Sequence, residues 1–202
     1  MDLTVARTGI GGFAAPIKAR VAMIVGADAA LIRRCRRGDD EAWQTLVHNY
    51  QDTVYQVSYR LLGNRDDAFE ASQETFVAAF RSIKGFRGDS TFKTWLTKIA
   101  TRQSLKIISN RRSWDELSHD TAPLPDSAAA SAVNSDLAQT VKAVLLNLSP
   151  GLRATIVLRE FDGLTYEEIS ETLGISIGTV ESRLHRGRAY LRLALVDYVG
   201  AE

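Results

Sequence analysis

The sequence LTYEEISETLGISIGTVESRL, at residues 164–184, predicts two helices joined by a tight turn. Thr165 and Glu168 have the spacing of a capping box, which is typical of a helix start. Gly174 supplies the positive backbone angle that a tight turn requires. The stretch is therefore interpreted as a helix-turn-helix.

The second helix of this motif separates its apolar and polar side chains onto two faces. Ser176 or Thr179 caps it, and Val180 and Leu184 face the core. Small polar residues come first and arginines follow, an order that suits a helix lying in the major groove of DNA. Arginines supply affinity through phosphates, while contacts to base edges select the sequence. The expected DNA-contacting residues are Ser176, Thr179, Ser182, Arg183, Arg186 and Arg188.

A helical hairpin whose arginines only face solvent is the alternative interpretation. The cap, the turn glycine, the apolar spacing and the one-sided charge occur together, which argues against it. Since a helix-turn-helix occurs in many classes of regulator, the rest of the chain has to narrow the choice.

Apolar residues recur at steps of three and four through the first half of the chain, which predicts amphipathic helices. The first predicted helix covers residues 28–35, and the fourth covers residues 92–109. The second is capped by Asp39 or Asp40 and ends at Gly63-Asn64. The third is opened by Asp66 or Asp67 and closed by Gly85. On the third helix, Phe76 and Phe80 are expected to point inward.

Residues 113–136 differ from the rest of the chain in composition. They contain two prolines, a Ser/Ala run and five acids but no Lys or Arg, which predicts a flexible acidic linker. No alternating strand pattern is present, so the predicted fold is all-α, with small helical domains at residues 27–112 and 137–202. Residues 1–26 are interpreted as a flexible extension; alternatively, the true start is Met23.

The net charge of +1 hides two basic blocks. Residues 81–112 contain nine Lys or Arg and one acid, Asp89, while residues 177–192 contain four Arg and His185 against Glu181. Two basic blocks therefore flank the acidic linker, and this distribution favours nucleic acid as a partner.

No residue pattern typical of an active site is present. The three His residues have no metal-ligand spacing, and no phosphate loop, Ser-His-Asp set or paired Cys motif occurs. We therefore expect no enzyme activity, no metal and no cofactor. The single Cys35 favours a reducing, cytoplasmic location. No apolar stretch is long enough to span a bilayer, so membrane insertion is not expected.

Motifs of the first domain indicate a family. The sequence GFRGDSTFKTWLTKIA, at residues 85–100, closely resembles the promoter-melting segment of extracytoplasmic-function sigma factors of the sigma-70 family. QETF at residues 73–76 resembles their polymerase-binding motif, and LIRRCRRGD at residues 31–39, followed by Ala42-Trp43, resembles their opening.

The second domain is similar to the same family through LSP at residues 148–150 and GTVESRLHR at residues 178–186. The resemblance covers residues 28–195 in the family's order, and this ordered set is far more specific than any single motif.

The resemblance implies that the first domain opens the promoter −10 element and captures an unpaired base in the loop at residues 86–92. Flipped bases are usually held by aromatic or apolar packing together with polar contacts. The implied −10 residues are Phe86, Arg87, Asp89, Ser90, Phe92, Lys98, Arg102 and Lys106, and Lys93 is a further cation near phosphates. Trp95 is expected in the core, while Phe86 and Phe92 are left open between core and base contact.

The resemblance also implies partners. Gln73, Glu74 and Phe76 are expected to dock on the clamp helices of the largest subunit of core RNA polymerase, and the flap of the second-largest subunit is a further contact. The second domain then reads the −35 element of promoter DNA. The linker either mimics nucleic acid in the polymerase cleft or is an inert tether. An anti-sigma protein is an expected partner as well.

The chain departs from the family pattern at several positions. Many relatives carry Glu-Asp in place of Phe69-Glu70. This departure lies on the helix that is expected to contact the polymerase, so that contact is expected to differ from the family pattern. Arg102 and Lys106 stand where Asn or Asp is frequent in the family. We expect either a different −10 preference or a loss of base reading with a gain in affinity for phosphates. Gly187 replaces a more usual Ala and is expected to weaken its helix by somewhat under about 1 kcal/mol.

Two other functions remain as alternatives. One is a sigma-like decoy that binds a regulator without DNA, and the presence of both basic faces argues against it. The other is a conventional helix-turn-helix transcriptional regulator. The melting segment and the lack of an evident ligand domain argue against that function.

Overall fold

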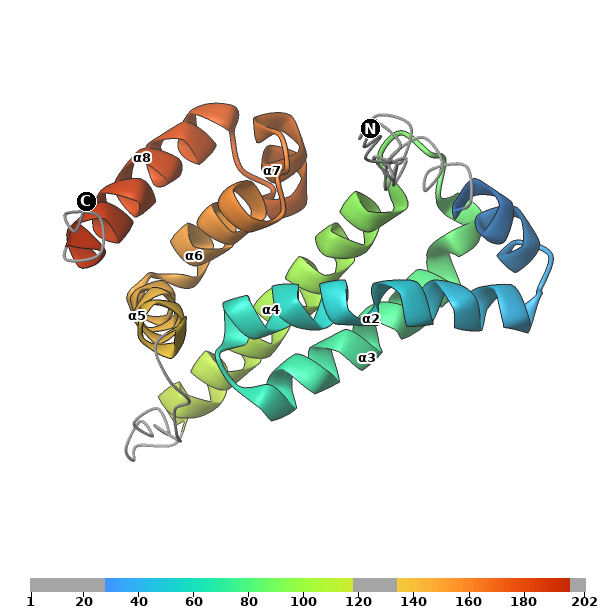
Figure 1. The fold of residues 1–202 in the computed structure, drawn as a ribbon, viewed down its shortest axis with the longest axis horizontal. Coiled ribbons are helices and arrows are strands. Elements are labelled where there is room, and N and C mark those ends of the chain that lie inside the picture. The colour runs from blue at the N-terminus through green and yellow to red at the C-terminus, as the bar shows by residue number, and fades with distance from the viewer. Residues whose placement is uncertain (1–27, 118–133, 197–202) are drawn as a thin grey trace, which may run out of the picture.

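The computed structural model describes residues 28–117 and 134–196, and every regular element in these two ranges is helical (Figure 1). A first helix covers residues 28–35. The others are α2 (Asp40–Leu62), α3 (Arg65–Ser82), the 3₁₀ turn η1 (Ile83–Gly85), α4 (Phe92–Leu117), α5 (Asn134–Asn147), α6 (Pro150–Ile156), the π-helical turn η2 (Val157–Phe161), α7 (Tyr166–Leu173) and α8 (Ile177–Ala194). The predicted all-α class is confirmed.

Side-chain caps determine where α2 and α3 begin. The carboxylate of Asp39 accepts a hydrogen bond from the backbone N–H of Ala42 at 3.0 Å. Asn64 accepts from the N–H groups of Asp66 at 2.8 Å and Asp67 at 3.2 Å. The expectation that Asp66 or Asp67 opens α3 is therefore wrong. Both acids lie in the first turn, where their negative charges interact favourably with the positive end of the helix dipole.

The helix-turn-helix forms as predicted. Thr165 accepts from the N–H of Glu168 at 3.2 Å, and the Glu168 carboxylate accepts from the N–H of Thr165 at 2.9 Å. Gly174 ends α7 with a φ of 64°. Ser176, rather than Thr179, caps α8.

Helix extends further into the predicted linker than its composition indicates. α4 continues to Leu117 and α5 begins at Asn134, so residues 113–117 and 134–136 are helical. The rest of the predicted linker and the predicted N-terminal extension, with Met23, lie outside the described residues. None of the helices in the described ranges combines the length and the apolar character needed to cross a bilayer.

The first domain is a bundle in which α2, α3 and α4 pack against one another. Its core contains an aromatic group at the start of α4. The ring of Phe92 lies 5.3 Å from that of Tyr50 and 5.7 Å from that of Phe86, and Phe86 lies 5.1 Å from Trp95. Trp95 is half-buried and packs against the core, as expected.

The second domain packs α6, α7 and α8 around Ile156, Ile169, Val180 and Leu184, all of which are almost fully buried. This core continues into that of the first domain, because one cluster of buried apolar side chains includes residues of both. Figure 1 shows α5 and α6 beside α2.

Gly187 has a packing role that helix propensity does not indicate. It is buried on the inner face of α8, and a Cβ atom there would lie 2.5 Å from Cδ1 of the fully buried Ile156. The restricted space, rather than a weak helix, explains the glycine.

We expect Gly187→Ala to lower the free energy of unfolding by about 1 kcal/mol, measured by urea denaturation. Overpacking costs about 1–3 kcal/mol and exceeds the gain of up to about 1 kcal/mol in helix propensity. Gly178→Ala is the matched control, because Gly178 lies on the same helix with open space around its Cα. A Gly187→Ala chain as stable as wild type would show that Ile156 moves aside without cost.

Candidate functional site

The loop before α4 presents two unpaired charged side chains. Gly88 turns the loop with a φ of 86°, and the Thr91 hydroxyl accepts from the N–H of Thr94 at 3.1 Å to start α4. Arg87 and Asp89 are exposed, and neither makes a hydrogen bond or ion pair with the described residues. Both are therefore free to contact an incoming polar ligand.

Phe86 and Phe92 lie in the core beneath this loop. Their side chains are 8% and 3% exposed, respectively, because they pack against each other and against neighbouring aromatic rings. The choice left open by the sequence, core or base contact, is resolved here in favour of the core. Stacking by a base would require both rings to leave the core.

The basic face of α4 carries Lys98, Arg102 and Lys106, one helical turn apart. Arg102 and Lys106 are exposed. The Lys98 side chain is only 13% exposed, and its ammonium donates to the carboxylate of Glu171 on α7 at 2.5 Å. The hydrogen bond from Lys98, reinforced by the charges of Lys98 and Arg102, lowers the pKa of Glu171.

The predicted polymerase-binding residues on α3 do not all face the same way. Gln73 and Glu74 are exposed, but Phe76 is half-buried, with its ring 6.4 Å from that of Trp43. Phe80 was expected to point inward; its ring lies 5.2 Å from that of Trp43, but 49% of it is exposed, so the prediction is wrong in that Phe80 is not part of the buried core.

Sequence periodicity missed an apolar surface on α3. Phe69, Val77 and Phe80 are 59%, 41% and 49% exposed. At about 100° per residue, these three side chains and Gln73 lie on one side of the helix. Of these, Val77 and Phe80 border a hollow between α2 and α3 together with Trp43. Three large apolar side chains on one exposed face indicate a protein-binding surface.

The outer face of α8 carries only part of the predicted DNA-contacting set. Ser176, Ser182 and Arg186 are exposed, and Thr179 is partly exposed. His185, which the prediction did not include, is exposed one residue before Arg186.

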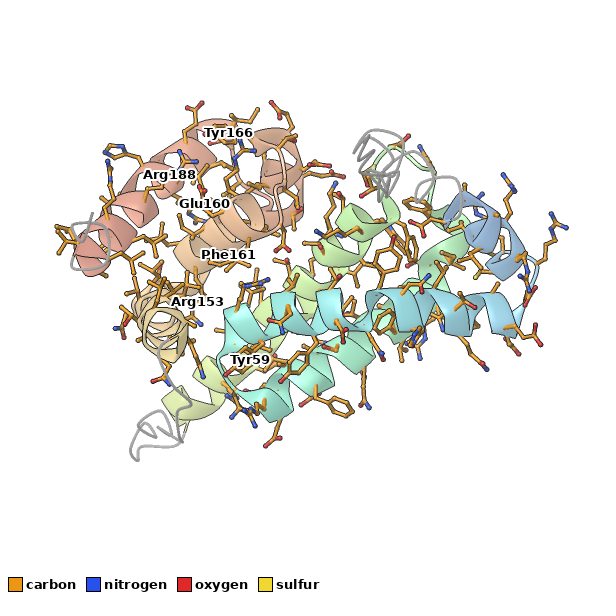
Figure 2. All side chains as sticks on the ribbon, viewed as in Figure 1. Tyr59, Arg153, Glu160, Phe161, Tyr166 and Arg188 are labelled. Carbon is orange, nitrogen blue, oxygen red and sulfur yellow. The ribbon has the colours of Figure 1, made fainter. Side chains whose placement is uncertain are left out.

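Two of the predicted arginines contact their own domain. Arg183 reaches the carbonyl oxygen of Gly151 at 3.4 Å. Arg188 makes an ion pair with Glu160 at 2.8 Å beside Tyr166 (Figure 2). This ion pair raises the pKa of Arg188. Both side chains pack at the edge of α8, so Arg186 is the arginine best placed for a base or phosphate.

An open groove of about 900 Å³ runs along α8 on the side of Arg188. Its apolar lining is Val141, Phe161, Leu184, Leu191 and Leu195. In the described ranges, no three His, Cys, Asp or Glu side chains are grouped as metal ligands would be.

Two family models match the chain in order. The model described as Sigma-70 region 2 matches residues 46–113, and the model described as Sigma-70, region 4 matches residues 138–191.

Curated relatives agree with this assignment. The chain is 34% identical over 181 residues to the ECF RNA polymerase sigma factor SigW of Bacillus subtilis, covering 82% of this chain and 95% of that protein. It is 40% identical over 164 residues to the ECF RNA polymerase sigma factor SigE of Mycolicibacterium smegmatis, covering 77% of this chain and 63% of that protein's length.

Solved structures share the fold. CnrH in complex with the cytosolic domain of CnrY matches with a TM-score of 0.61 and 28% identity, over 85% of this chain and 98% of that chain. The sigma factor RpoE from Bartonella quintana, in complex with the anti-sigma factor NepR, matches with a TM-score of 0.58 and 23% identity, over 75% and 95% of the two chains.

Proposed function

Because the chain belongs to the extracytoplasmic-function sigma factors of the sigma-70 family, we propose specific residues for each step by which it acts. It is an RNA polymerase sigma factor: it directs core polymerase to promoters and helps open the −10 element. One observation supports the residue assignments. On both domains, polar or basic side chains are exposed at positions that the family motifs predict.

In the first domain, residues 27–112, the loop and the outer face of α4 hold the −10 element. Arg87, Asp89 and Ser90 contact the flipped base, and Arg102 and Lys106 attract phosphates of the melted strand. The exposure and lack of partners of Arg87 and Asp89 support this assignment.

The face of α3 binds the clamp helices of the largest polymerase subunit. Gln73 and Glu74 supply polar contacts, and Phe69, Val77 and Phe80 supply the apolar area. This surface is consistent with protein interfaces, in which a few large apolar side chains contribute most of the affinity.

In the second domain, residues 137–202, α8 enters the major groove at the −35 element. Ser182 and Arg186 lie on its outer face and contact bases or phosphates of the DNA. Arg183 and Arg188 instead hold the helix in place through their contacts with Gly151 and Glu160. The apolar groove beside α8 receives the flap of the second-largest subunit.

The chain acts without cofactor or catalytic activity of its own, in the cytoplasm. Its regulator is an anti-sigma protein. The sigma factor RpoE of Bartonella quintana was crystallised with one, and the structure of CnrH was solved in complex with the cytosolic domain of CnrY.

In vitro transcription with purified core polymerase and a promoter library tests this assignment. We expect Arg186→Ala to reduce initiation about tenfold or more and to relax the −35 preference, since a base or phosphate contact of arginine is worth about 1–3 kcal/mol. We expect Arg87→Ala/Asp89→Ala to change the −10 preference or the rate of opening.

Arg37→Ala is the control, because it removes one exposed arginine that lies outside the proposed DNA-binding and polymerase-binding surfaces. Folded wild-type chain that neither binds core polymerase nor initiates would refute the function. It would favour the decoy, a protein that binds a regulator without DNA.

A further inference from the structure

Arg36 connects the first helix to the start of the loop that precedes α4. Its guanidinium donates to the carbonyl oxygen of Phe86, the first residue of that loop, and its Nε lies 3.5 Å from the carbonyl oxygen of Ile83 in η1. Arg36 and Phe86 are 50 residues apart in the chain, so no local motif indicates this contact. Figure 1 shows the first helix, in dark blue, beside the segment that leads from α3 to α4.

The first helix is itself held in the core. Ile32 and Cys35 are only 5% and 6% exposed. The Tyr50 hydroxyl of α2 donates to the buried carboxylate of Asp28 at 2.5 Å. The backbone N–H of Arg36 donates to the carbonyl oxygen of Ile32 at 3.0 Å. The helix therefore fixes the backbone of Arg36, and the side chain of Arg36 links this fixed point to the loop.

The loop is held at both ends, and only residues 87–91 lie between them. At its end, the ring of Phe92 packs 5.7 Å from that of Phe86 inside the core. At its start, Arg36 holds the Phe86 carbonyl, which belongs to the planar peptide group that joins Phe86 to Arg87. The orientation of this peptide group sets the direction in which the chain leaves the core and carries the side chain of Arg87.

We infer that Arg36 is a positioning residue for base capture at the −10 element. The inference rests on the proposed function of the loop, in which Arg87, Asp89 and Ser90 contact the flipped base. Arg36 acts on these residues through the peptide group after Phe86. A binding site holds its polar groups to within about 0.5 Å of the productive geometry, and hydrogen bonds weaken steeply when they are misaligned. Without Arg36, the loop still attracts DNA but distinguishes less well between bases.

Arg36→Ala tests the geometry in the absence of polymerase. Hydrogen exchange of the full-length chain is measured by mass spectrometry on peptides that cover the loop. We expect the amides of residues 87–91 to exchange about three- to tenfold faster than in wild type, because a hydrogen bond from a charged donor is lost. Arg33→Ala is the matched control, since Arg33 is an exposed arginine of the same helix that makes no hydrogen bond or ion pair with the described residues. Its loop amides are expected to exchange at the wild-type rate.

A second measurement reports base capture. Holoenzymes made with wild type, Arg33→Ala, Arg36→Ala and Arg36→Lys initiate on promoters in which the captured base of the −10 element is varied. We expect Arg36→Ala to lower the ratio of initiation between the preferred base and the other bases by about three- to tenfold, as expected for the partial loss of one polar contact. Arg36→Lys should retain part of the ratio, because an ammonium group still donates to a carbonyl oxygen. A residue that only stabilises the fold would lower initiation equally on every sequence and leave the ratio unchanged.

Loop exchange at the wild-type rate in Arg36→Ala, or an unchanged base ratio, overturns the inference. The Arg87→Ala/Asp89→Ala holoenzyme separates this failure from failure of the proposed function. If that holoenzyme loses the base ratio while Arg36→Ala keeps it, only the inference fails. If it keeps the wild-type ratio, the loop does not read the base, and the proposed function of the loop fails together with the inference.

Discussion

Phe69→Asp/Phe80→Asp is expected to weaken binding to core polymerase by about 100-fold or more and to abolish transcription at ordinary concentrations. Both residues are about half exposed on α3 and neither belongs to the buried core of the first domain, although the Phe80 ring lies 5.2 Å from that of Trp43. Each hot-spot side chain at an interface contributes about 2 kcal/mol or more, and two together exceed a hundredfold in affinity. The measurement is binding to fluorescently labelled core polymerase, followed by in vitro transcription.

Gln51→Asp/Gln56→Asp is the control for this prediction. It adds the same two negative charges to exposed positions of the same domain, on α2. Circular dichroism melting should show that both double variants fold. If the variant with two Asp residues on α3 binds polymerase as wild type does, the clamp helices dock elsewhere.

Arg153→Met is expected to lower the free energy of unfolding by about 3 kcal/mol, the largest stability effect of a single substitution that we foresee. The guanidinium donates to the carbonyl oxygens of Leu146 at 2.7 Å and Leu148 at 3.1 Å, and also to that of Leu61. Leu61 lies in the last turn of α2, and Leu146 in the last turn of α5. Such carbonyls have no partner within their own helix, and the negative end of the helix dipole favours a cation there.

The size of this effect follows from burial. Arg153 is only 9% exposed, and methionine fills a similar volume but leaves the buried carbonyls without donors, each loss costing about 1–3 kcal/mol. Urea denaturation measures it. The stability of Arg153→Lys should fall between those of wild type and Arg153→Met, because one ammonium group replaces the several N–H donors of the guanidinium. Exposed Arg186→Met should change stability by less than about 0.5 kcal/mol. Equal stability of Arg153→Met and Arg186→Met would contradict this role.

Features that depend on neighbouring residues in the chain were predictable. The capping box of Thr165 and Glu168, the turn at Gly174 and the cap at Asp39 all involve atoms within four residues of one another. The same holds for the periodicity of the helices, and these features suffice for an all-α fold with a helix-turn-helix. The family motifs, read in order, then identified the surfaces on which the candidate residues lie.

Two errors arose where a local pattern allows two outcomes. Asn64 and Asp66 are both good caps, and the structure uses Asn64. Phe76 and Phe80 are one helical turn apart, so periodicity placed both inward. In the bundle, both rings lie beside Trp43, but Phe76 is half-buried against the core, while about half of Phe80 is exposed.

The sequence by itself determined the helices, their caps, the helix-turn-helix and the family, because these depend on short-range hydrogen bonds and on motif order. Only the tertiary structure decided the contacts between residues far apart in the chain. Arg153 binds the carbonyl oxygen of Leu61, 92 residues away, and Glu171 binds Lys98, 73 residues away. Gly187 is buried against Ile156, and the same packing rules out a larger residue there without strain. No local periodicity encodes such pairs, since they form only when packed helices bring the two side chains together.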